Sequence, residues 1–241
     1  MTRLDRRMVD EGLVPSRAKA RALIEAGAVT VDGSSVSKPS ADLQGRIAIT
    51  KDPCPWVSRA GLKLAHAVER FGLKPNGVAV DVGASTGGFT DVLLAYGAAH
   101  VHAIDVGHDQ LHPKLTQDQR VTLHQGINAR DLPAGLVPPV DWIVADLSFI
   151  SLEKVLPSVL PLAKSGAYLV LLIKPQFEVG RGHVGKGGVV RDLVQQQAAA
   201  YRISAFVTRH GWRVMGVIDS PIAGGDGNRE YLLAAVNDGS N

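Results

Sequence analysis

The sequence of 241 residues predicts an α/β fold, in which a seven-stranded, mostly parallel doubly wound sheet follows a small α+β unit. After residue 77, five short apolar runs alternate with helical stretches and two further runs close the chain, which is the pattern of a doubly wound sheet. The first 50 residues instead combine two helical segments with short strands. A stretch with two prolines, residues 51–56, separates the two parts.

Helix and turn signals define the first unit, residues 1–52. Residues 3–11 are expected to be helical, and Ser16 and Gly27 are expected to cap and end a second helix. Residues 29–37 predict two short strands around a turn, and residues 44–51 a further strand. The excess positive charge lies here, because residues 1–62 hold ten basic and seven acidic side chains, whereas residues 63–241 hold sixteen of each.

The second unit, residues 60–241, follows a predicted linker over residues 53–59. A helix over residues 57–72 precedes the first strand, and a long helix follows Asp192. Two more helices are expected over Gly88–Tyr96 and Leu152–Ala163. The strands are predicted at Val78–Val82, Val101–Ile104, Val121–Leu123, Trp142–Ala145, Ala167–Ile173, Trp212–Ile218 and Tyr231–Val236.

Composition excludes several classes of protein. The single cysteine, Cys54, makes no intramolecular disulfide and gives no thiol pair for zinc, so we expect a reducing cytoplasm and no metal site. The N-terminus has no apolar segment of a secretory signal, and no apolar run is long enough to span a bilayer. We therefore expect no membrane partner.

A glycine-rich turn after the first long strand is the strongest ligand signal. Its pattern, D-x-G-x-x-x-G-G-F-T, departs from the dinucleotide fingerprint and resembles the first motif of Rossmann-like S-adenosylmethionine (SAM) methyltransferases. Asp81 alone is equally consistent with a loop-stabilising carboxylate. A carboxylate after the second strand is suited to ribose hydroxyls, and the residues after the third strand to an adenine. The predicted cofactor residues are Asp81, Gly83, Ser85, Gly87, Gly88, Phe89, Asp105, Val106, Asn128, Ala129 and Asp146.

Four charged residues at predicted strand ends and on the preceding helix suggest the chemistry. Lys63, Asp146, Lys174 and Glu230 resemble the Lys-Asp-Lys-Glu tetrad of FtsJ-type ribose 2′-O-methyltransferases. A lysine close to a second cation and partly removed from water loses its proton more readily, so Lys174 is the candidate base and Lys63 the flanking cation. The two carboxylates are expected to orient the lysines and the hydroxyl. The chain lacks the Pro-Pro motif of many base methyltransferases, and its cysteine lies in the linker.

Residues 3–33, which include S-R-x-x-A-x-x-L-I-x-x-G, resemble an S-four-type RNA-binding module. The resemblance implies RNA contacts from Arg17, Lys19 and Arg21, although basic residues on one helix are also typical of a plain solvated face. A glycine-rich basic segment, residues 178–192, is expected to form a loop over the active site, or else a simple surface connection. The remaining predicted RNA contacts are Arg3, Arg6, Arg59, Arg181, Lys186 and Arg191.

The order of the two units, with the motifs WVSRAGLKL, DVGASTGGFTDVLL, DLSFISL, LIKPQFEVGR and KGGVVRD, resembles the TlyA, or haemolysin A-like, family. That resemblance implies SAM-dependent 2′-O-methylation of cytidine in ribosomal RNA of the small subunit, the large subunit or both. Some members have a basic residue where this linker has Cys54. The alternatives are a membrane-active haemolysin, a non-catalytic RNA-binding assembly factor, and a methyltransferase acting on a base or small molecule. The oligomeric state stays open.

Overall fold

The computed structural model describes residues 2–25, 27–50 and 54–239, and divides the chain into two compact units, Met1–Pro55 and Trp56–Asn241. The predicted boundaries at 52/53 and 59/60 stay predictions, and Pro53 of the predicted linker lies outside the described residues. Each unit has its own apolar core.

The first unit packs two helices on a three-stranded antiparallel sheet of order β2-β1-β3. Leu4, Met8, Leu23 and Ile24 are fully or almost fully buried between them. The Ser16 hydroxyl accepts the Lys19 N–H at 3.3 Å, as expected of a helix cap. The elements are α1 (Leu4–Asp10), α2 (Arg17–Glu25), β1 (Val29–Val31), β2 (Ser34–Ser35) and β3 (Ile47–Ile49).

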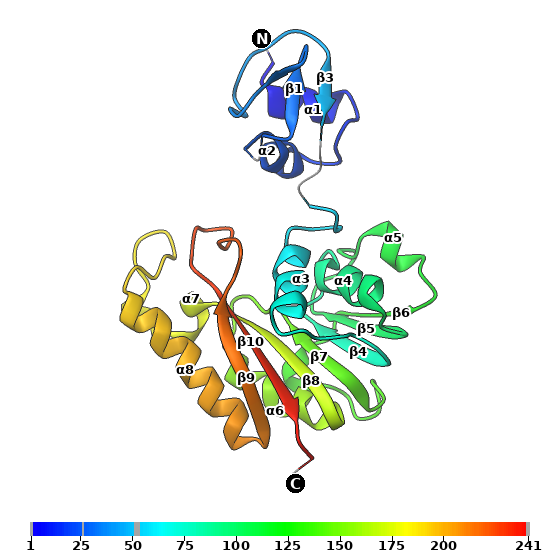
Figure 1. Ribbon diagram of the computed structural model, residues 1–241, viewed down its shortest axis with the longest axis vertical. Coiled ribbons are helices and arrows are strands. Elements are labelled where there is room, and N and C mark those ends of the chain that lie inside the picture. Colours follow the sequence, from blue (N-terminus) through cyan, green and yellow to red (C-terminus); the bar gives the residue numbers. More distant parts are fainter. Residues whose placement is uncertain (1, 26, 51–53, 240–241) are drawn as a thin grey trace. The chain divides into compact units, whose positions relative to one another are not determined.

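The second unit is built on a seven-stranded sheet of order β6-β5-β4-β7-β8-β10-β9, which confirms the predicted fold class (Figure 1). Strands β4 to β8 pair in parallel, and β10 runs antiparallel to both of its neighbours. The strands are β4 (Val78–Val82), β5 (His100–Asp105), β6 (Val121–Gln125), β7 (Val140–Ala145), β8 (Ala163–Ile173), β9 (Trp212–Asp219) and β10 (Tyr231–Asn237).

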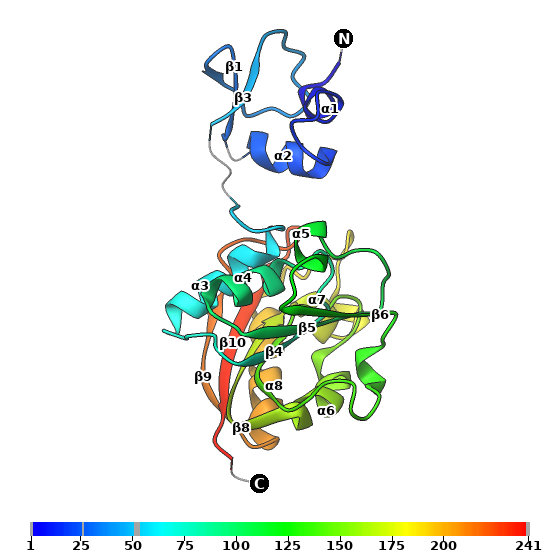
Figure 2. The same ribbon diagram turned by 90° about the vertical axis from the view of Figure 1, so that its right-hand side faces the viewer.

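Helices cover both faces of this sheet, so its central strands are apolar on both sides (Figure 2). Trp142 and Val144 of β7 point to the face covered by α3 and α4, whereas Ile143 and Ala145 point to the face of α6 and α8. All four are fully or almost fully buried. The helices are α3 (Ala60–Arg70), α4 (Gly88–Tyr96), α5 (Pro113–Thr116), α6 (Leu156–Val159), α7 (Pro175–Glu178) and α8 (Leu193–Arg209).

The helix expected over Leu152–Ala163 is wrong as a single element. The segment breaks into a 3₁₀ turn at Leu152–Lys154, the one-turn α6, and a second 3₁₀ turn at Leu160–Leu162. Pro157 and Pro161 explain the breaks, because proline lacks an N–H and restricts the residue before it. The long helix after Asp192 is confirmed, and the Asp192 carboxylate accepts the Val194 N–H at 2.8 Å.

No helix in the described part of the chain is long and apolar enough to cross a membrane.

Candidate active site

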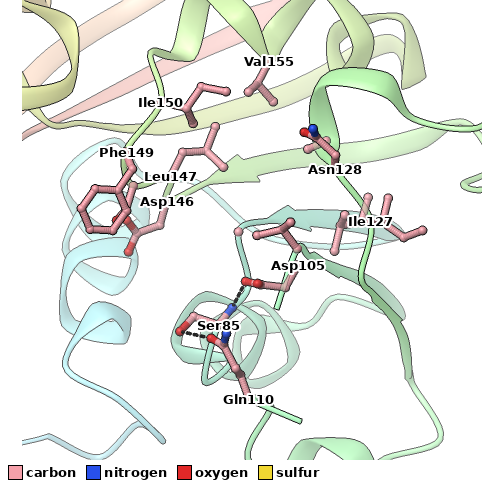
Figure 3. A pocket seen from close by; sticks show the side chains of 15 residues that line it. Ser85, Asp105, Gln110, Ile127, Asn128, Asp146, Leu147, Phe149, Ile150 and Val155 are labelled. Atoms are coloured by element: carbon pink, nitrogen blue, oxygen red, sulfur yellow. Dashed lines mark hydrogen bonds between the residues drawn. The ribbon is translucent and has the colours of Figure 1, made fainter. Parts of the chain in front are cut away.

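A cavity of about 390 Å³ opens at the carboxyl ends of β4, β5 and β7 (Figure 3). This edge is where open α/β sheets receive their ligands, because the loops that leave neighbouring parallel strands meet there. The volume suits a small organic ligand. The lining residues are Gly83, Ser85, Ile104, Asp105, Val106, Gln110, Ile127, Asn128, Ala129, Asp146, Leu147, Ser148, Phe149, Ile150 and Val155.

The glycine-rich turn forms a close-fitting floor for this region. Gly83 has a φ of +83°, and a methyl group there would lie 2.7 Å from the Asp146 carbonyl oxygen. Gly87 has a φ of +92°, and a side chain there would collide with Leu115. A side chain at Gly88 would collide with the Ser58 hydroxyl. At Gly83 and Gly87 both the positive φ and the close approach favour glycine, whereas at Gly88 the close approach alone excludes a side chain.

Asp105 lines the cavity at the end of β5 and fixes the backbone around it. Its two carboxylate oxygens accept backbone N–H groups from Ser85 and Gly107, each at 2.7 Å. The Ser85 hydroxyl donates in turn to the Gln110 side-chain oxygen at 3.2 Å (Figure 3). Farther along the cavity, the Asn128 side chain caps a 3₁₀ turn by accepting the Arg130 N–H at 3.1 Å. An ionised carboxylate has about four acceptor positions, so Asp105 can still accept hydroxyl groups from a ligand.

Asp81, at the end of β4, is fully buried beside this cavity. Its Oδ2 accepts the Thr90 hydroxyl at 2.7 Å, whereas Oδ1 has no hydrogen-bond partner among the described residues. Burial raises the pKa of Asp81 to about 7, the Thr90 hydrogen bond opposes this rise, and the charges of Asp146 and Asp105 add to it. The group is therefore poised between its neutral and charged forms near neutral pH.

A second, smaller recess of about 140 Å³ adjoins the cavity and shares Gly83, Ser85, Asp146 and Ser148 with it. Lys174, the residue directly after β8, reaches this recess. Its Nζ lies 2.6 Å from Asp146 Oδ1 and 2.9 Å from the Ser148 hydroxyl. The recess therefore brings a cation, a carboxylate and a hydroxyl together. Its other lining residues are Ser58, Ala60, Ala84, Thr86, Gly88 and Phe89.

Lys63 and Glu230 form a second ion pair at the same end of the sheet. Lys63 lies on α3, Glu230 directly precedes β10, and Nζ to Oε2 measures 2.6 Å. Their side chains are only 7% and 2% exposed. Across the β8–β10 ladder, Tyr231 pairs with Ile173, which brings Glu230 to the end of β8 that carries Lys174. The four residues of the predicted tetrad thus form two ion pairs, and the charge that faces Lys63 directly is Glu230.

Most of the predicted cofactor residues line these two spaces. Seven line the larger cavity, namely Gly83, Ser85, Asp105, Val106, Asn128, Ala129 and Asp146, and Gly88 and Phe89 line the recess. Asp81 and Gly87 line neither space. The binding roles of all eleven residues stay predictions.

The sequence reasoning used the segment after Asp146 only as the family motif DLSFISL and gave no role to Ser148 or Phe149. Ser148 contacts Lys174, and Phe149 lines the cavity with a ring that is 91% exposed. Phe149 also has a φ of +66°, which is rare for a non-glycine residue. Besides that motif, the sequence offered one signal, an aromatic residue directly after the strand-end Asp-Leu-Ser.

The predicted RNA-binding residues are spread over both units. In the first unit, Arg3 and Arg17 both bind the buried carboxylate of Asp5 at 3.0 Å, and about half of each side chain stays exposed. The guanidinium of Arg3 holds the pKa of Asp5 down at about 2. Arg6 pairs with Asp10 at 3.7 Å and Arg21 with Glu25 at 3.8 Å, and Lys19 lies on the same helix as Arg21.

In the second unit, the Arg59 guanidinium donates to the Ala223 carbonyl. Lys186 and Arg191 are exposed on the loop before α8, and the side chain of Arg181 lies outside the described residues.

Comparison with known proteins identifies the two units. Residues 2–45 match the S4 domain and residues 56–237 match the FtsJ-like methyltransferase. The chain is 45% identical to the 16S/23S rRNA (cytidine-2′-O)-methyltransferase TlyA of Mycobacterium tuberculosis, over 96% of this chain and 88% of that protein. The chain belongs to the TlyA family of FtsJ-like methyltransferases.

Other TlyA relatives carry a different name. Hemolysin A of Brachyspira hyodysenteriae is 40% identical over 95% of this chain and 98% of its own length. A solved hemolysin-like structure from Streptococcus thermophilus superposes with a TM-score of 0.77 at 36% identity, covering 98% of this chain and 88% of that one. Some relatives of this chain are therefore named for methyl transfer, and others for haemolysis.

Proposed function

We propose that this TlyA-family chain transfers a methyl group from SAM to the ribose 2′-hydroxyl of a cytidine in ribosomal RNA. The observation that carries the proposal is the pair of adjoining spaces, one suited to a nucleoside and the other containing Lys174 with Asp146 and Ser148. The Mycobacterium tuberculosis relative is named for this reaction on 16S and 23S rRNA. A cytoplasmic location, where ribosomal subunits occur, is part of the proposal.

The described residues fit SAM as the cofactor. Asp105 would accept the ribose hydroxyls, and Ile127 and Asn128 would flank the adenine in the larger cavity. The cradle from Gly83 to Gly88 would take the methionine portion, where side chains are sterically excluded and the N-terminus of α4 begins. The buried Oδ1 of Asp81, which lacks a hydrogen-bond partner in the described structure, adds an acceptor nearby. When bound, SAM supplies an already activated methyl group on a sulfonium.

The chain itself contributes a proton acceptor and its supports. Lys174 Nζ first gives its own proton to solvent at the open recess, and then takes the proton of the ribose hydroxyl. Asp146 contacts Nζ as an ion-pair partner and Ser148 accepts a hydrogen bond from it, so both restrict the position of Nζ. Lys63 and Glu230 form a buried ion pair at the same end of the sheet, although neither lines the cavity or the recess. The role of Lys63 as the cation that flanks Lys174 stays a prediction. Positioning of this kind can account for a large part of the rate enhancement.

The test is methyl transfer from labelled SAM to purified ribosomal subunits, followed by nuclease mapping of the label. We expect label on a ribose in the wild type. Lys174→Ala is expected to lose transfer by at least about 100-fold while SAM binding is retained. Lys164→Ala removes a lysine that also pairs with a carboxylate, Asp141, but on the surface, and serves as the matched control. Label on a base, or a Lys174→Ala variant with wild-type transfer, would refute the proposal.

We further propose that the first unit anchors ribosomal RNA through its arginines. Deletion of residues 1–55 is expected to abolish most rRNA binding and to flatten the salt dependence of what remains, because fewer phosphates are neutralised. SAM binding by the second unit is expected to survive, since its core and cavity lie within Trp56–Asn241. Filter binding at several salt concentrations and calorimetry with SAM measure the two quantities. Unchanged rRNA affinity would contradict this role.

A further inference from the structure

Two segments that follow neighbouring parallel strands run side by side at the active site. Residues 146–152 leave β7, and residues 174–178 leave β8 as the single turn of α7. They touch at both ends and in the middle. Lys174 contacts Asp146 and Ser148, the rings of Phe177 and Phe149 lie 5.2 Å apart, and Glu178 contacts the far end of the first segment.

Glu178 makes the far-end contact with a buried carboxylate. Its side chain is 2% exposed, Oε2 accepts the Ser151 hydroxyl at 2.7 Å, and Oε1 accepts the Leu152 N–H at 2.8 Å. Arg202 of α8 donates to Oε2 at 3.2 Å. Burial raises the pKa of Glu178, and these donors oppose the rise. A buried carboxylate is costly unless it is bonded in this way, so its position is tightly defined.

The backbone of residues 146–152, which Glu178 contacts, includes a strained residue and lines the cavity. Its residues from Leu147 to Ile150 line the larger cavity, and Ser148 also borders the recess. Phe149 adopts a positive φ, a strained conformation that persists only where the surroundings impose it. Phe149 is 91% exposed, so its contact with the Phe177 ring buries little of its surface. The contacts at Asp146–Ser148 and at Ser151–Leu152 must therefore hold the backbone between them.

Glu178 is also rigidly connected to Lys174. Lys174 is the N-cap of α7, Pro175 occupies its first turn, and Glu178 is its last residue. A shift of Ser151 relative to Glu178 therefore changes the placement of Ser148 relative to Lys174 Nζ. We propose that Glu178 is a positioning residue for methyl transfer, which fixes the Ser148–Phe149 segment against Lys174. This inference rests on the proposed function.

Glu153 offers a matched control, because its carboxylate contacts the same arginine, Arg202, as Glu178 does. The Arg202 Nε lies 3.5 Å from Glu153 Oε1, and the Glu153 side chain is 29% exposed. No hydrogen bond from that side chain reaches residues 146–152 in the described part of the chain. Glu153→Gln therefore removes an acidic partner of the same arginine without releasing the segment.

The experiment compares full-length Glu178→Gln and Glu178→Ala with Glu153→Gln and the wild type. It measures methyl transfer to ribosomal subunits, SAM affinity and melting temperature, with all rates taken well below each melting temperature. We expect kcat to fall by about 10- to 100-fold in Glu178→Ala and by less in Glu178→Gln, which can still accept the Leu152 N–H. The KM for rRNA is expected to stay unchanged, and SAM affinity to fall by a smaller factor than kcat. Glu153→Gln is expected to match the wild type.

A purely structural role predicts a different result, namely a lower melting temperature with an unchanged kcat for the folded protein. That result, in Glu178→Ala or Glu178→Gln, would overturn the inference. If Glu178→Ala does not fold, Ser151→Ala decides. This variant removes the hydroxyl that donates to Glu178 Oε2, and it should lower kcat non-additively with Glu178→Gln. If the wild type transfers no methyl group to rRNA, the proposed function fails. Unchanged SAM affinity in the Glu178 variants then overturns the positioning role as well.

Discussion

Replacing Asp81 by Asn should make the unliganded protein less sensitive to alkaline pH. Asp81 is fully buried, and its pKa is raised from 3.8 to about 7. Because the folded pKa lies above the unfolded one, this group's contribution to stability is fully present below pH 3.8 and is lost as the pH rises through 7. Asparagine keeps an acceptor for the Thr90 hydroxyl and has no charge to bury.

The size of the effect follows from the two pKa values. At pH 8, ionisation of Asp81 favours the unfolded chain by about 4 kcal/mol, and at pH 5 by about 2 kcal/mol. Between these pH values the wild type should therefore lose about 2–3 kcal/mol relative to Asp81→Asn. In a unit of this size, that corresponds to about 5–10 °C in melting temperature.

Thermal unfolding without SAM at pH 5, 6.5 and 8 measures this difference. The absolute stability of Asp81→Asn can lie above or below that of the wild type, because its amide N–H₂ is buried without a planned partner. The quantity to compare is therefore the difference in melting temperature between the wild type and Asp81→Asn, followed as a function of pH. Titrating groups that both proteins share cancel in this difference. Thr90→Val, which removes the hydrogen bond that lowers the pKa of Asp81, should steepen the loss above pH 7. Parallel pH profiles for the wild type and Asp81→Asn would refute the reasoning.

Three further outcomes are expected. Gly83→Ala should lower the free energy of unfolding by about 2 kcal/mol or more and impair SAM binding, because it combines backbone strain with a collision. Gly135→Ala, where φ is +75° and the space is open, should lower it only by the strain of about 1 kcal/mol. Urea unfolding measures the two stabilities, and calorimetry measures SAM binding. Phe149→Ala should leave the melting temperature unchanged, since the ring is exposed, and reduce methylation of ribosomal subunits; equal activity would exclude a role at the cavity. Burial lowers the pKa of His102 to about 4, so the free energy of unfolding should fall as the pH drops from 6.5 through 4. His102→Asn should make this fall smaller in urea unfolding at several pH values. The same dependence on pH in both proteins would contradict the prediction.

The strands and the glycine-rich turn were predictable from the sequence for clear physical reasons. A parallel strand covered on both faces must be continuously apolar, and Val78–Val82 was predicted with its observed bounds. Glycines that follow such a strand mark a place where side chains do not fit, and Gly83 shows that collision directly. These signals are local, so a pattern of a few residues carries them.

The features that were missed depend on contacts between distant residues. The segment expected to be helical over Leu152–Ala163 is broken at Pro157 and Pro161, which the prediction did not take into account. The importance of Glu178 depends on Ser151 and Arg202, more than 20 residues away on either side. The pairing of Lys63 with Glu230 joins residues 167 positions apart, so the sequence placed both at the site without assigning them to each other.

The shared carboxylate of Asp5 has a consequence for how net charge relates to RNA affinity. It holds two half-exposed guanidinium groups in place, so a phosphate that meets them need not order either side chain. Asp5→Asn would make the chain more basic by one charge and release both arginines. If these arginines bind rRNA as proposed, the more positive variant should bind it more weakly. In the first unit, the positions of the charged groups would then affect rRNA affinity more than the net charge does.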